Sequence, residues 1–374
     1  MAKSGPLKVL HLINTLSAGG AELHLLTLCR HQKRLGLEVT VACLREQVRD
    51  SRSLRPDFEQ AGIRVIDLRA RSRYNWQFLA RTPLLLRRER FDLLHTHLPR
   101  ADLAGLAAKL IAPEITWVCS VHGMYKSWSG NRILFLFSRV WGRADAMIAV
   151  SHAVKDWLEQ ERCLPPEKVA VIRYGIEPAH FSPAKARQRK RNGSAVIGSL
   201  GRLEYRKGHH ILIEAMPLIL RQEPRARLLI AGHDPEGYGR TLKDVIRQLG
   251  LREQVALAGF QRDVPGFLKS IDVFAFASLS EGFGQVLIEA MAAGRPVVAT
   301  RIPPLTEIVR DGETGLLADM NDPHAFAQGI IRLLRNPEKA EQLGKAGMRR
   351  VQRFFSAERM SRETFRLYKR VLDQ

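Results

Sequence analysis

The stretch Ser280-Glu281-Gly282-Phe283-Gly284-Gln285-Val286-Leu287-Ile288-Glu289-Ala290-Met291 closely follows the apolar run Val273–Ala277. The apolar run has the length and composition of a buried strand, and residues 285–293 have those of a helix that opens after two glycines. Strand, loop and helix in this order are the repeating part of a parallel sheet. We therefore expect an α/β fold in which ligands bind beyond the carboxyl ends of the strands.

The same alternation fills the chain in two blocks. Between them, residues 182–194 are basic and nearly free of apolar side chains, which is typical of a linker. The pattern predicts two parallel-sheet domains, residues 1–181 and 195–355, and a final helical segment, residues 356–374. The candidate strands of the first block are Leu7–Ile13, Glu38–Leu44, Ile63–Leu68, Phe91–His95, Thr116–Val121, Ala146–Val150 and Val169–Ile172. Those of the second are Ala195–Leu200, Ala226–Ala231, Gln254–Ala258, Val273–Ala277 and Pro296–Ala299.

Composition fits a soluble globular protein in a reducing compartment. The 374 residues are 45% hydrophobic and 26% charged, which excludes a disordered chain and leaves room for two cores. No apolar run approaches the ~20 residues that cross a bilayer, and Leu7–Ile13 is better explained as a first strand than as a signal peptide. The cysteines lack the paired spacing of a zinc ribbon or redox pair, so we expect a cytoplasmic protein with reduced core thiols. They are Cys29, Cys43, Cys119 and Cys163.

The net charge of +21 predicts an anionic partner. Much of the excess lies in residues 69–100, where eight arginines face only Glu89 and Asp92 and where Trp76 adds an aromatic ring. Such a segment is typical of a helix at an anionic membrane surface, and equally of an ordinary amphipathic helix whose period Pro83 interrupts. Nucleic acid is suggested by charge alone. Because no recognised binding module or zinc site accompanies that charge, we expect no nucleic-acid partner.

Charged residues and glycines gather after the predicted strands. Arg202 could bind a phosphate through two N–H groups, and Lys207 supplies a point charge. Glycines at 282 and 284 expose the start of the next helix, whose unpaired N–H groups favour a phosphate. Glu281 and Glu289 would repel that phosphate, so their natural partners are hydroxyl groups. The alternative is that none of the four side chains binds a ligand: the two cations and Glu281 would face water, and Glu289 would pair with a cation.

These motifs together resemble the retaining glycosyltransferases of family four. Glu281 and Glu289 match the E-x7-E motif of that family, and the resemblance covers nearly the whole chain in the correct order. One departure is Tyr174-Gly175-Ile176-Glu177, where the family commonly has Asn-Gly-Ile-Asp. The other matches are Gly19-Gly20-Ala21-Glu22, Val121-His122-Gly123, Val150-Ser151, Gly201-Arg202, Lys207-Gly208, the stretch from Ala290 to Thr300, and the stretch from Asp311 to Leu317.

The resemblance implies the GT-B fold, in which two Rossmann-like parallel-sheet domains face each other across a cleft. It assigns diphosphate binding to Arg202 and Lys207, donor-sugar hydroxyls to Glu281, the ribose to Glu289, and a place beside the reacting centre to His122. These residues, apart from Glu289, form the expected catalytic set. The expected donor-binding set is Gly19, Gly20, Gly259, Phe260, Gln261, Gly282, Phe283, Gly284 and Glu289.

The implied reaction transfers a hexose or N-acetylhexosamine from a nucleotide-sugar, with retention, in polysaccharide or glycolipid biosynthesis. A UDP-sugar is favoured and GDP-mannose is possible. The sequence has no aspartate cluster of the D-x-D type, so we expect no metal and no cofactor, the cations neutralising the diphosphate instead. The alternative is a non-catalytic nucleotide-sugar-binding protein at the membrane. The joint presence of all five side chains named above argues against it.

The acceptor is expected on the N-terminal domain, as a glycan or lipid-linked molecule at the inner face of the cytoplasmic membrane. The candidate contacts are His97, Tyr125, Lys126 and Arg132. His95 and His97 come at the end of their predicted strand, where they could contact the acceptor or equally be ordinary loop histidines. Phe135, Phe137 and Trp141 either serve the acceptor or pack in the core. The segment 356–374 is expected to pack back on the first domain.

Overall fold

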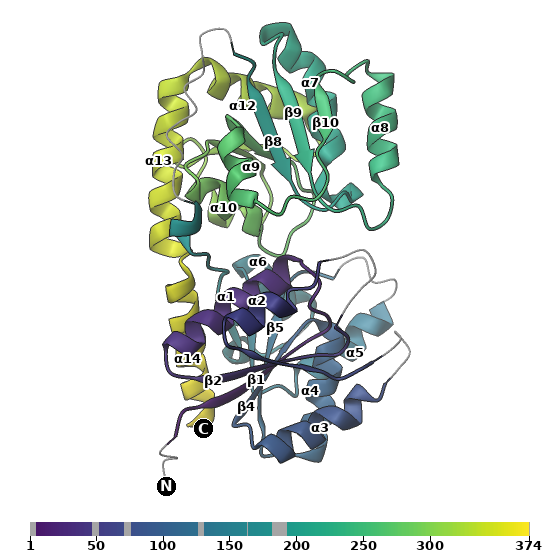
Figure 1. Cartoon of the computed structure of the whole chain (residues 1–374), viewed down its shortest axis with the longest axis vertical. Coiled ribbons are helices and arrows are strands. Elements are labelled where there is room, and N and C mark those ends of the chain that lie inside the picture. The colour runs from purple at the N-terminus through teal and green to yellow at the C-terminus, as the bar shows by residue number, and fades with distance from the viewer. Residues whose placement is uncertain are drawn as a thin grey trace. The chain divides into compact units, whose positions relative to one another are not determined.

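The computed structural model describes residues 5–46, 52–70, 76–125, 131–162, 164–181 and 193–373 (Figure 1). Internal contacts divide the chain into two compact units, Met1–Ile176 with Ala357–Gln374, and Glu177–Ser356. The division falls after Ile176, a few residues before the predicted linker, of which residues 182–192 lie outside the described part. Cys163 and the candidate acceptor residue Lys126 lie outside it as well.

Among the described residues of the first unit, seven parallel strands form one sheet in the order β3-β2-β1-β4-β5-β6-β7. Most strand residues are buried, as expected where helices cover both faces of a parallel sheet. The strands are β1 (Lys8–Ile13), β2 (Glu38–Cys43), β3 (Arg64–Asp67), β4 (Leu93–His97), β5 (Thr116–Val121), β6 (Ala146–Ala149) and β7 (Val169–Val171). The helices are α1 (Gly20–Arg34), α2 (Arg55–Gln60), α3 (Phe78–Glu89), α4 (Pro99–Ile111), α5 (Asn131–Trp141) and α6 (His152–Asp156).

In the described part of the second unit, six parallel strands follow the order β10-β9-β8-β11-β12-β13. Five were predicted. The sixth, β13, is three residues long and was not predicted. The strands are β8 (Val196–Leu200), β9 (Arg227–Ala231), β10 (Val255–Leu257), β11 (Val273–Phe276), β12 (Val297–Thr300) and β13 (Leu316–Ala318). The helices are α7 (His209–Gln222), α8 (Gly239–Gln248), α9 (Val264–Ser270), α10 (Gln285–Ala292), α11 (Leu305–Ile308), α12 (Pro323–Arg335) and α13 (Pro337–Phe354).

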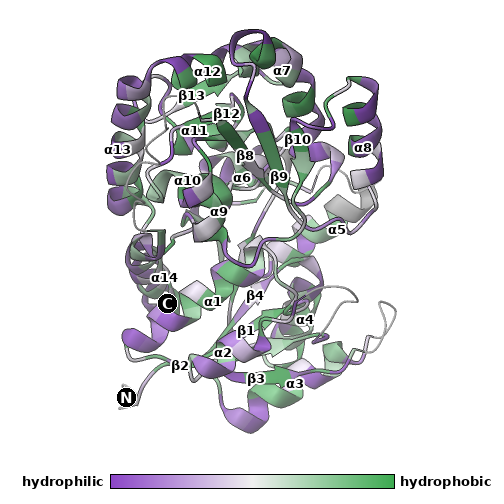
Figure 2. Ribbon diagram, turned by 45° about the horizontal axis from the view of Figure 1, so that its top comes forward, coloured by the Kyte–Doolittle hydropathy of each residue, from purple (hydrophilic) through white to green (hydrophobic). Residues whose placement is uncertain are grey.

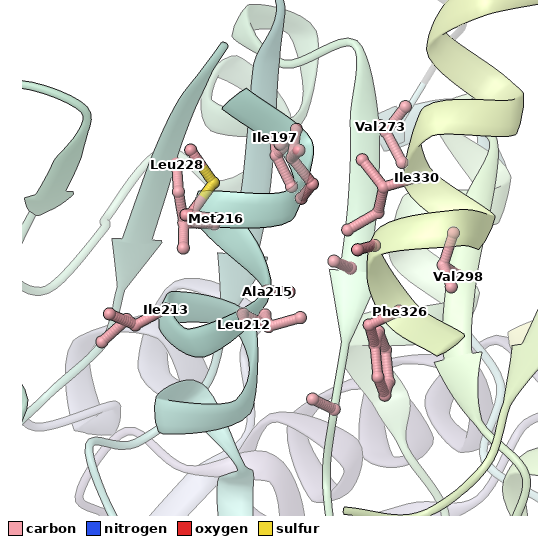
Figure 3. Packing of buried hydrophobic residues seen from close by; sticks show 14 of the residues in the cluster. Ile197, Leu212, Ile213, Ala215, Met216, Leu228, Val273, Val298, Phe326 and Ile330 are labelled. Carbon is pink, nitrogen blue, oxygen red and sulfur yellow. The ribbon is translucent and has the colours of Figure 1, made fainter. Parts of the chain in front are cut away.

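The core of the second unit lies between its sheet and the helices α7 and α12. Met216 of α7 packs near Leu228 of β9, and Phe326 and Ile330 of α12 pack near Val298 of β12 (Figure 3). Phe326 is fully buried, so truncating it to alanine is expected to cost about 3–5 kcal/mol. Strands β8 and β9 are mainly hydrophobic, whereas α13 is mainly hydrophilic (Figure 2). This core fixes the strand ends from which the candidate site is built.

The last helix, α14 (Ala357–Leu372), belongs to the first unit and packs beside α1 (Figure 1). Met360, Leu367 and Tyr368 are buried in the core of that unit, at the helical spacing of one apolar face. The C-terminal end of the chain therefore completes a domain built from its beginning.

Pro83 lies inside α3 and does not end the helix. The helix continues because its buried face, Phe78, Thr82 and Leu86, packs in the unit, while the Thr82 hydroxyl donates to the Phe78 carbonyl at 2.8 Å. None of the described helices combines the length and apolar character that a membrane crossing requires.

Candidate active site

The second unit has a topological switch point at β8. The chain leaves β8 for β9 on one side and later returns to β11 on the other side. The loops that follow β8 and β11 therefore run apart, and ligands bind at such points in open parallel sheets. Arg202 and Lys207 follow β8, and Glu281 follows β11, so the fold brings these three predicted residues to one place.

Two glycine positions hold these loops in contact. Gly208 has φ +65°, and a Cβ there would lie 1.9 Å from the Ala277 carbonyl oxygen, so no other residue fits without displacement of the loop. The Leu279 N–H donates to the Arg206 carbonyl at 2.8 Å and ties the same two loops together. In the neighbouring loop, a Cβ at Gly232 would lie 1.8 Å from the Gly201 carbonyl oxygen. Close backbone approach therefore sets the position of Lys207.

Lys207 and Glu281 form a largely buried ion pair. The Lys207 Nζ donates to Glu281 Oε1, and the Ser278 hydroxyl donates to the same oxygen at 2.8 Å. Burial acts to raise the pKa of Glu281, but the Lys207 ammonium and the hydrogen bonds more than offset it and hold that pKa below its usual value. Burial lowers the pKa of Lys207, and Glu281 opposes that shift. Each group therefore favours the charged form of the other.

Two further cations surround this pair. Arg202 pairs with Glu204 at 2.8 Å, and Arg206 pairs with the other oxygen of the same carboxylate at 2.7 Å. The Arg202 side chain is 55% exposed, so its guanidinium can leave Glu204 for another anion at small cost. With three cations against two carboxylates, the loops are suited to bind an anionic group.

Glu289 lies on α10, one helical turn after Gln285, whose amide donates to Glu289 Oε1 at 2.9 Å. Burial raises the pKa of Glu289 to about 7, against the opposing effect of that hydrogen bond. Gly284, with φ +105°, precedes the helix, and the Phe283 ring is buried against Phe355 at a centroid distance of 5.8 Å. The buried Phe283 ring therefore anchors the loop that precedes α10, with Gly282 beside it.

The predicted base-binding segment follows β10. Gly259 has φ +66° and its carbonyl accepts from the Gly232 N–H at 2.9 Å, so the segment is fixed to the loop after β9. Phe260 is 46% exposed, and the Gln261 amide turns back to the Ala258 carbonyl at 2.9 Å. The exposed Phe260 ring is thus the group here that offers an apolar face to a ligand.

The first unit has its own switch point between β1 and β4. Gly19 precedes α1 in an extended conformation, and Gly20 begins that helix. His122 follows β5, and its Nδ1 lies 2.5 Å from the Tyr174 hydroxyl. Burial lowers the pKa of His122 to about 3, which keeps the ring neutral. Tyr174 is one of the two positions, with Glu177, at which the chain departs from the family pattern, and its partnership with His122 was not predicted.

The predicted strand ended too early, and neither alternative for His95 and His97, acceptor contact or an exposed loop, is correct. Strand β4 runs through both residues to His97, which pairs with Ile13 of β1 and Ser120 of β5. Both rings are fully buried. The strand continues because their polar nitrogens have partners inside the fold, so burying them leaves no unpaired group. His97 contacts His122 at 3.1 Å and has no exposed surface to offer an acceptor.

The other candidate acceptor residues lie around α5. The Tyr125 ring lies against Trp141 and Trp157, at centroid distances of 6.3 and 6.2 Å. Arg132 belongs to α5, but its side chain is outside the described part of the chain. Phe137 and Trp141 are core residues, whereas Phe135 is 59% exposed. The aromatic residues of this helix thus divide between core and surface.

Two family models match this chain. The model for Glycosyltransferase Family 4 matches residues 18–180, and that for Glycosyl transferases group 1 matches residues 181–350. An uncharacterized glycosyltransferase of Methanocaldococcus jannaschii is 30% identical, covering 76% of this chain and 77% of that protein. A D-inositol 3-phosphate glycosyltransferase of Corynebacterium urealyticum is 27% identical, covering 95% and 91%. An N-acetyl-alpha-D-glucosaminyl L-malate synthase of Bacillus anthracis is 27% identical, covering 80% of each chain.

Among solved structures, Anabaena HepE in complex with UDP and glucose superposes with a TM-score of 0.85 at 23% identity, covering 97% of this chain and 99% of that one. The two parallel-sheet units thus have the GT-B fold of glycosyltransferases. The chain belongs to glycosyltransferase family 4.

Proposed function

We propose that the protein transfers a hexose or N-acetylhexosamine from a nucleotide-sugar to a glycan or lipid-linked acceptor, with retention and without a metal ion. The observation that carries this proposal is the buried Lys207–Glu281 pair at the switch point of the second unit. A fixed cation beside a fixed carboxylate matches a donor whose diphosphate is anionic and whose sugar carries hydroxyl groups.

The roles follow from the charges. Lys207 and Arg202 would neutralise the diphosphate as it leaves, Arg202 after exchanging Glu204 for phosphate oxygens. Glu281 would accept hydrogen bonds from the sugar and Glu289 from the ribose. The leaving diphosphate would take the proton of the attacking acceptor hydroxyl, as is described for the family. His122 would lie beside the sugar, and the exposed Phe260 ring would cover the base.

A UDP-sugar is the favoured donor, because the Anabaena neighbour was solved with UDP and glucose. GDP-mannose is the second candidate, because a site that binds the nucleotide base through backbone groups near Gly259 would also accept a purine. A thermal-shift panel of UDP-, GDP- and ADP-sugars decides between them. We expect a UDP-sugar to raise the Tm most, and a larger rise with GDP-mannose would assign the second candidate instead.

We further propose that the first unit meets an anionic membrane at the cytoplasmic face. Leu84 of α3 is 65% exposed, Leu110 of α4 is 66% exposed, and Arg87 donates to the Ile111 carbonyl at 2.9 Å. Arg88 is 85% exposed beside them, so apolar and basic side chains share one surface of two packed helices. Such a surface suits anionic headgroups.

Vesicle flotation tests the membrane proposal. Binding to vesicles with anionic lipid should exceed binding to neutral ones, and Arg88→Glu should weaken it, whereas Arg247→Glu on α8 of the other unit should not. Equal binding of all forms to both vesicle types would remove the electrostatic basis.

The substitution Glu281→Ala tests the catalytic proposal, with Glu341→Ala as a control because Glu341 is 57% exposed on α13. We expect loss of sugar transfer and of the extra stabilisation that the donor gives beyond the nucleotide alone, while the control retains both. Retention of both by Glu281→Ala would refute the site. Donor stabilisation of the wild type without turnover on any glycan or lipid acceptor would favour the non-catalytic alternative.

A further inference from the structure

A chain of hydrogen bonds runs through the interior of the first unit to His122. It links rings from β1 and β4 to the helices α1 and α14. The links are Tyr174 hydroxyl to His122 Nδ1 (2.5 Å), His122 Nε2 to His97 Nδ1 (3.1 Å), His97 Nε2 to His11 Nδ1 (3.0 Å), His11 Nε2 to Gln32 Oε1 (2.7 Å), Gln32 Nε2 to the Tyr368 hydroxyl (3.1 Å), Tyr368 hydroxyl to His95 Nδ1 (2.5 Å) and His95 Nε2 to the Ser120 hydroxyl (2.8 Å).

Burial keeps the rings of this chain neutral. The pKa of His11 is lowered to about 4 by burial, against the Gln32 hydrogen bond, and the pKa values of His95 and His97 lie well below their usual value because of burial and the neighbouring rings. A neutral imidazole has one N–H and one acceptor nitrogen. Since each ring uses both nitrogens, the direction of one hydrogen bond fixes the direction of the next.

The amide of Gln32 gives the chain its direction. As it is oriented, Gln32 Oε1 can only accept, so His11 donates from Nε2 and accepts at Nδ1 from His97. His97 then accepts at Nδ1 from His122, which leaves His122 Nδ1 as an acceptor for the Tyr174 hydroxyl. Turning the amide over would reverse every bond and place the His122 proton on Nδ1.

His122 is the member of this hydrogen-bond chain that solvent or a substrate can reach. Of the chain members that the structure describes, it alone is partly exposed, whereas Gln32, His11 and Tyr368 are fully buried. The His122 nitrogen that faces Tyr174 is an acceptor in one arrangement and a donor in the other. A substrate hydroxyl that replaces Tyr174 would meet a lone pair in the first case and an N–H in the second.

We propose that Gln32, held by a hydrogen bond to Tyr368 of the C-terminal helix, is a positioning residue that sets the tautomer of His122 through His11 and His97. The catalytic meaning of that tautomer rests on the proposed function, but the tautomer itself does not. The hydrogen bond to Gln32 requires α14 to be docked, because the Tyr368 hydroxyl on that helix is the partner of Gln32 Nε2 and continues the chain to His95.

A metal ion is the competing explanation of the cluster. Nitrogen atoms of His11, His95 and His97 lie within 4.8 Å of one another, close enough for shared coordination. However, both nitrogens of each ring already have hydrogen-bond partners within the chain, and the three rings are fully buried. The arrangement therefore favours hydrogen bonding, and metal content becomes an outcome of the test.

The tautomer can be read directly from the ¹⁵N shifts of the His122 ring in free protein labelled at histidine. We expect a neutral ring with its proton on Nε2 in the wild type. Gln32→Met should shift His122 toward a mixture of tautomers, and Tyr368→Phe should do so more weakly. Ser361→Ala is the matched control, because Ser361 is buried on the same helix and its hydroxyl has no partner in the described part of the chain.

Turnover gives the second readout. Gln32→Met should lower kcat by roughly 10- to 100-fold, as loss of a partner that orients a functional histidine does elsewhere, with little change in donor KM. An unchanged His122 spectrum in folded Gln32→Met, or one equivalent of bound metal in the purified wild type, would overturn the proposal. A shifted spectrum in a protein that transfers no sugar would support the chain and refute the proposed function instead.

Discussion

Both units contain a parallel sheet, but the polar groups at their switch points differ in charge. Each places its functional groups at a switch point of a parallel sheet. In the second unit these groups are charged and compensate each other, with Lys207 paired to Glu281. In the first unit they are neutral rings with their hydrogen bonds satisfied, buried except for the partly exposed His122. The same type of sheet can thus carry two kinds of buried polar site. Paired charges suit an anionic ligand, and neutral hydrogen-bonded rings suit hydroxyl groups.

The largest expected effect comes from breaking the charged pair. Lys207→Ala leaves the Glu281 carboxylate buried without its partner, which should cost about 3–5 kcal/mol of unfolding free energy. Transfer should fall roughly 10²–10³-fold, as when one charge-stabilising donor is lost. Urea unfolding and turnover measure the two losses.

Lys345→Ala is the matched control, because the Lys345–Glu341 pair is exposed and should contribute only about 0–1 kcal/mol. Similar losses in both variants would show that Lys207 has no special place.

The next largest effect is on the pH dependence of stability, which we expect to differ between the two units. His11 and His122 have folded pKa values of about 4 and about 3, below the unfolded value of 6.5. The unfolded chain therefore binds more protons between these values, and stability falls as pH drops below 6.5, by up to about 1.4 kcal/mol per pH unit for each histidine. Asp102 and Glu289 have raised pKa values of about 7, so they weaken stability as pH rises from their unfolded values toward 7.

The first unit holds five histidines with lowered pKa values, and only Asp102 among the groups named above acts in the opposite direction there. Its stability should therefore rise more steeply from pH 5 to 6.5 than that of the second unit. The five are His11, His24, His95, His97 and His122. Hydrogen exchange resolved by unit measures this, and His11→Asn should flatten the first unit's slope. Equal slopes for the two units would contradict the contrast.

A third effect tests how the charged site is assembled. Gly208→Ala adds a Cβ that meets the Ala277 carbonyl in addition to the strain of a positive φ, and should cost about 3 kcal/mol. Gly250→Ala has a similar φ of +69° and open space around the new Cβ, so about 1 kcal/mol is expected. Denaturant midpoints compare the two. Equal losses would mean that loop contact does not position Lys207.

The smallest expected effect concerns Glu289. Because its pKa is about 7, the carboxylate that would accept ribose hydroxyls becomes fully available only above neutral pH. Donor affinity should therefore rise by up to roughly tenfold from pH 6 to 8. Calorimetric titration of wild type and Glu289→Gln checks this, and the variant should show a flat profile. A persistent rise in the variant would assign the pH effect to another group.

The charged site was largely predictable, because its residues follow strands that the sequence marks with β-branched runs. Their place after predicted strands made Arg202, Lys207 and Glu281 candidates, and the family resemblance assigned them to one site. The histidine chain could not. Its bonds join residues far apart in the chain, 86 positions for His11 and His97 and 336 for Gln32 and Tyr368, and no local pattern encodes such pairs. Polar residues inside a strand also misled the prediction, so that β4 was ended too early.

Donor binding to the free enzyme and its variants tests the central claim most directly. UDP and the matching UDP-sugar should both bind the wild type. Glu281→Ala should keep UDP binding and lose the extra affinity that the sugar gives, whereas Lys207→Ala should lose both. Calorimetry that finds wild-type affinity for nucleotide and nucleotide-sugar in both variants would contradict the assignment of the Lys207–Glu281 pair as the donor site.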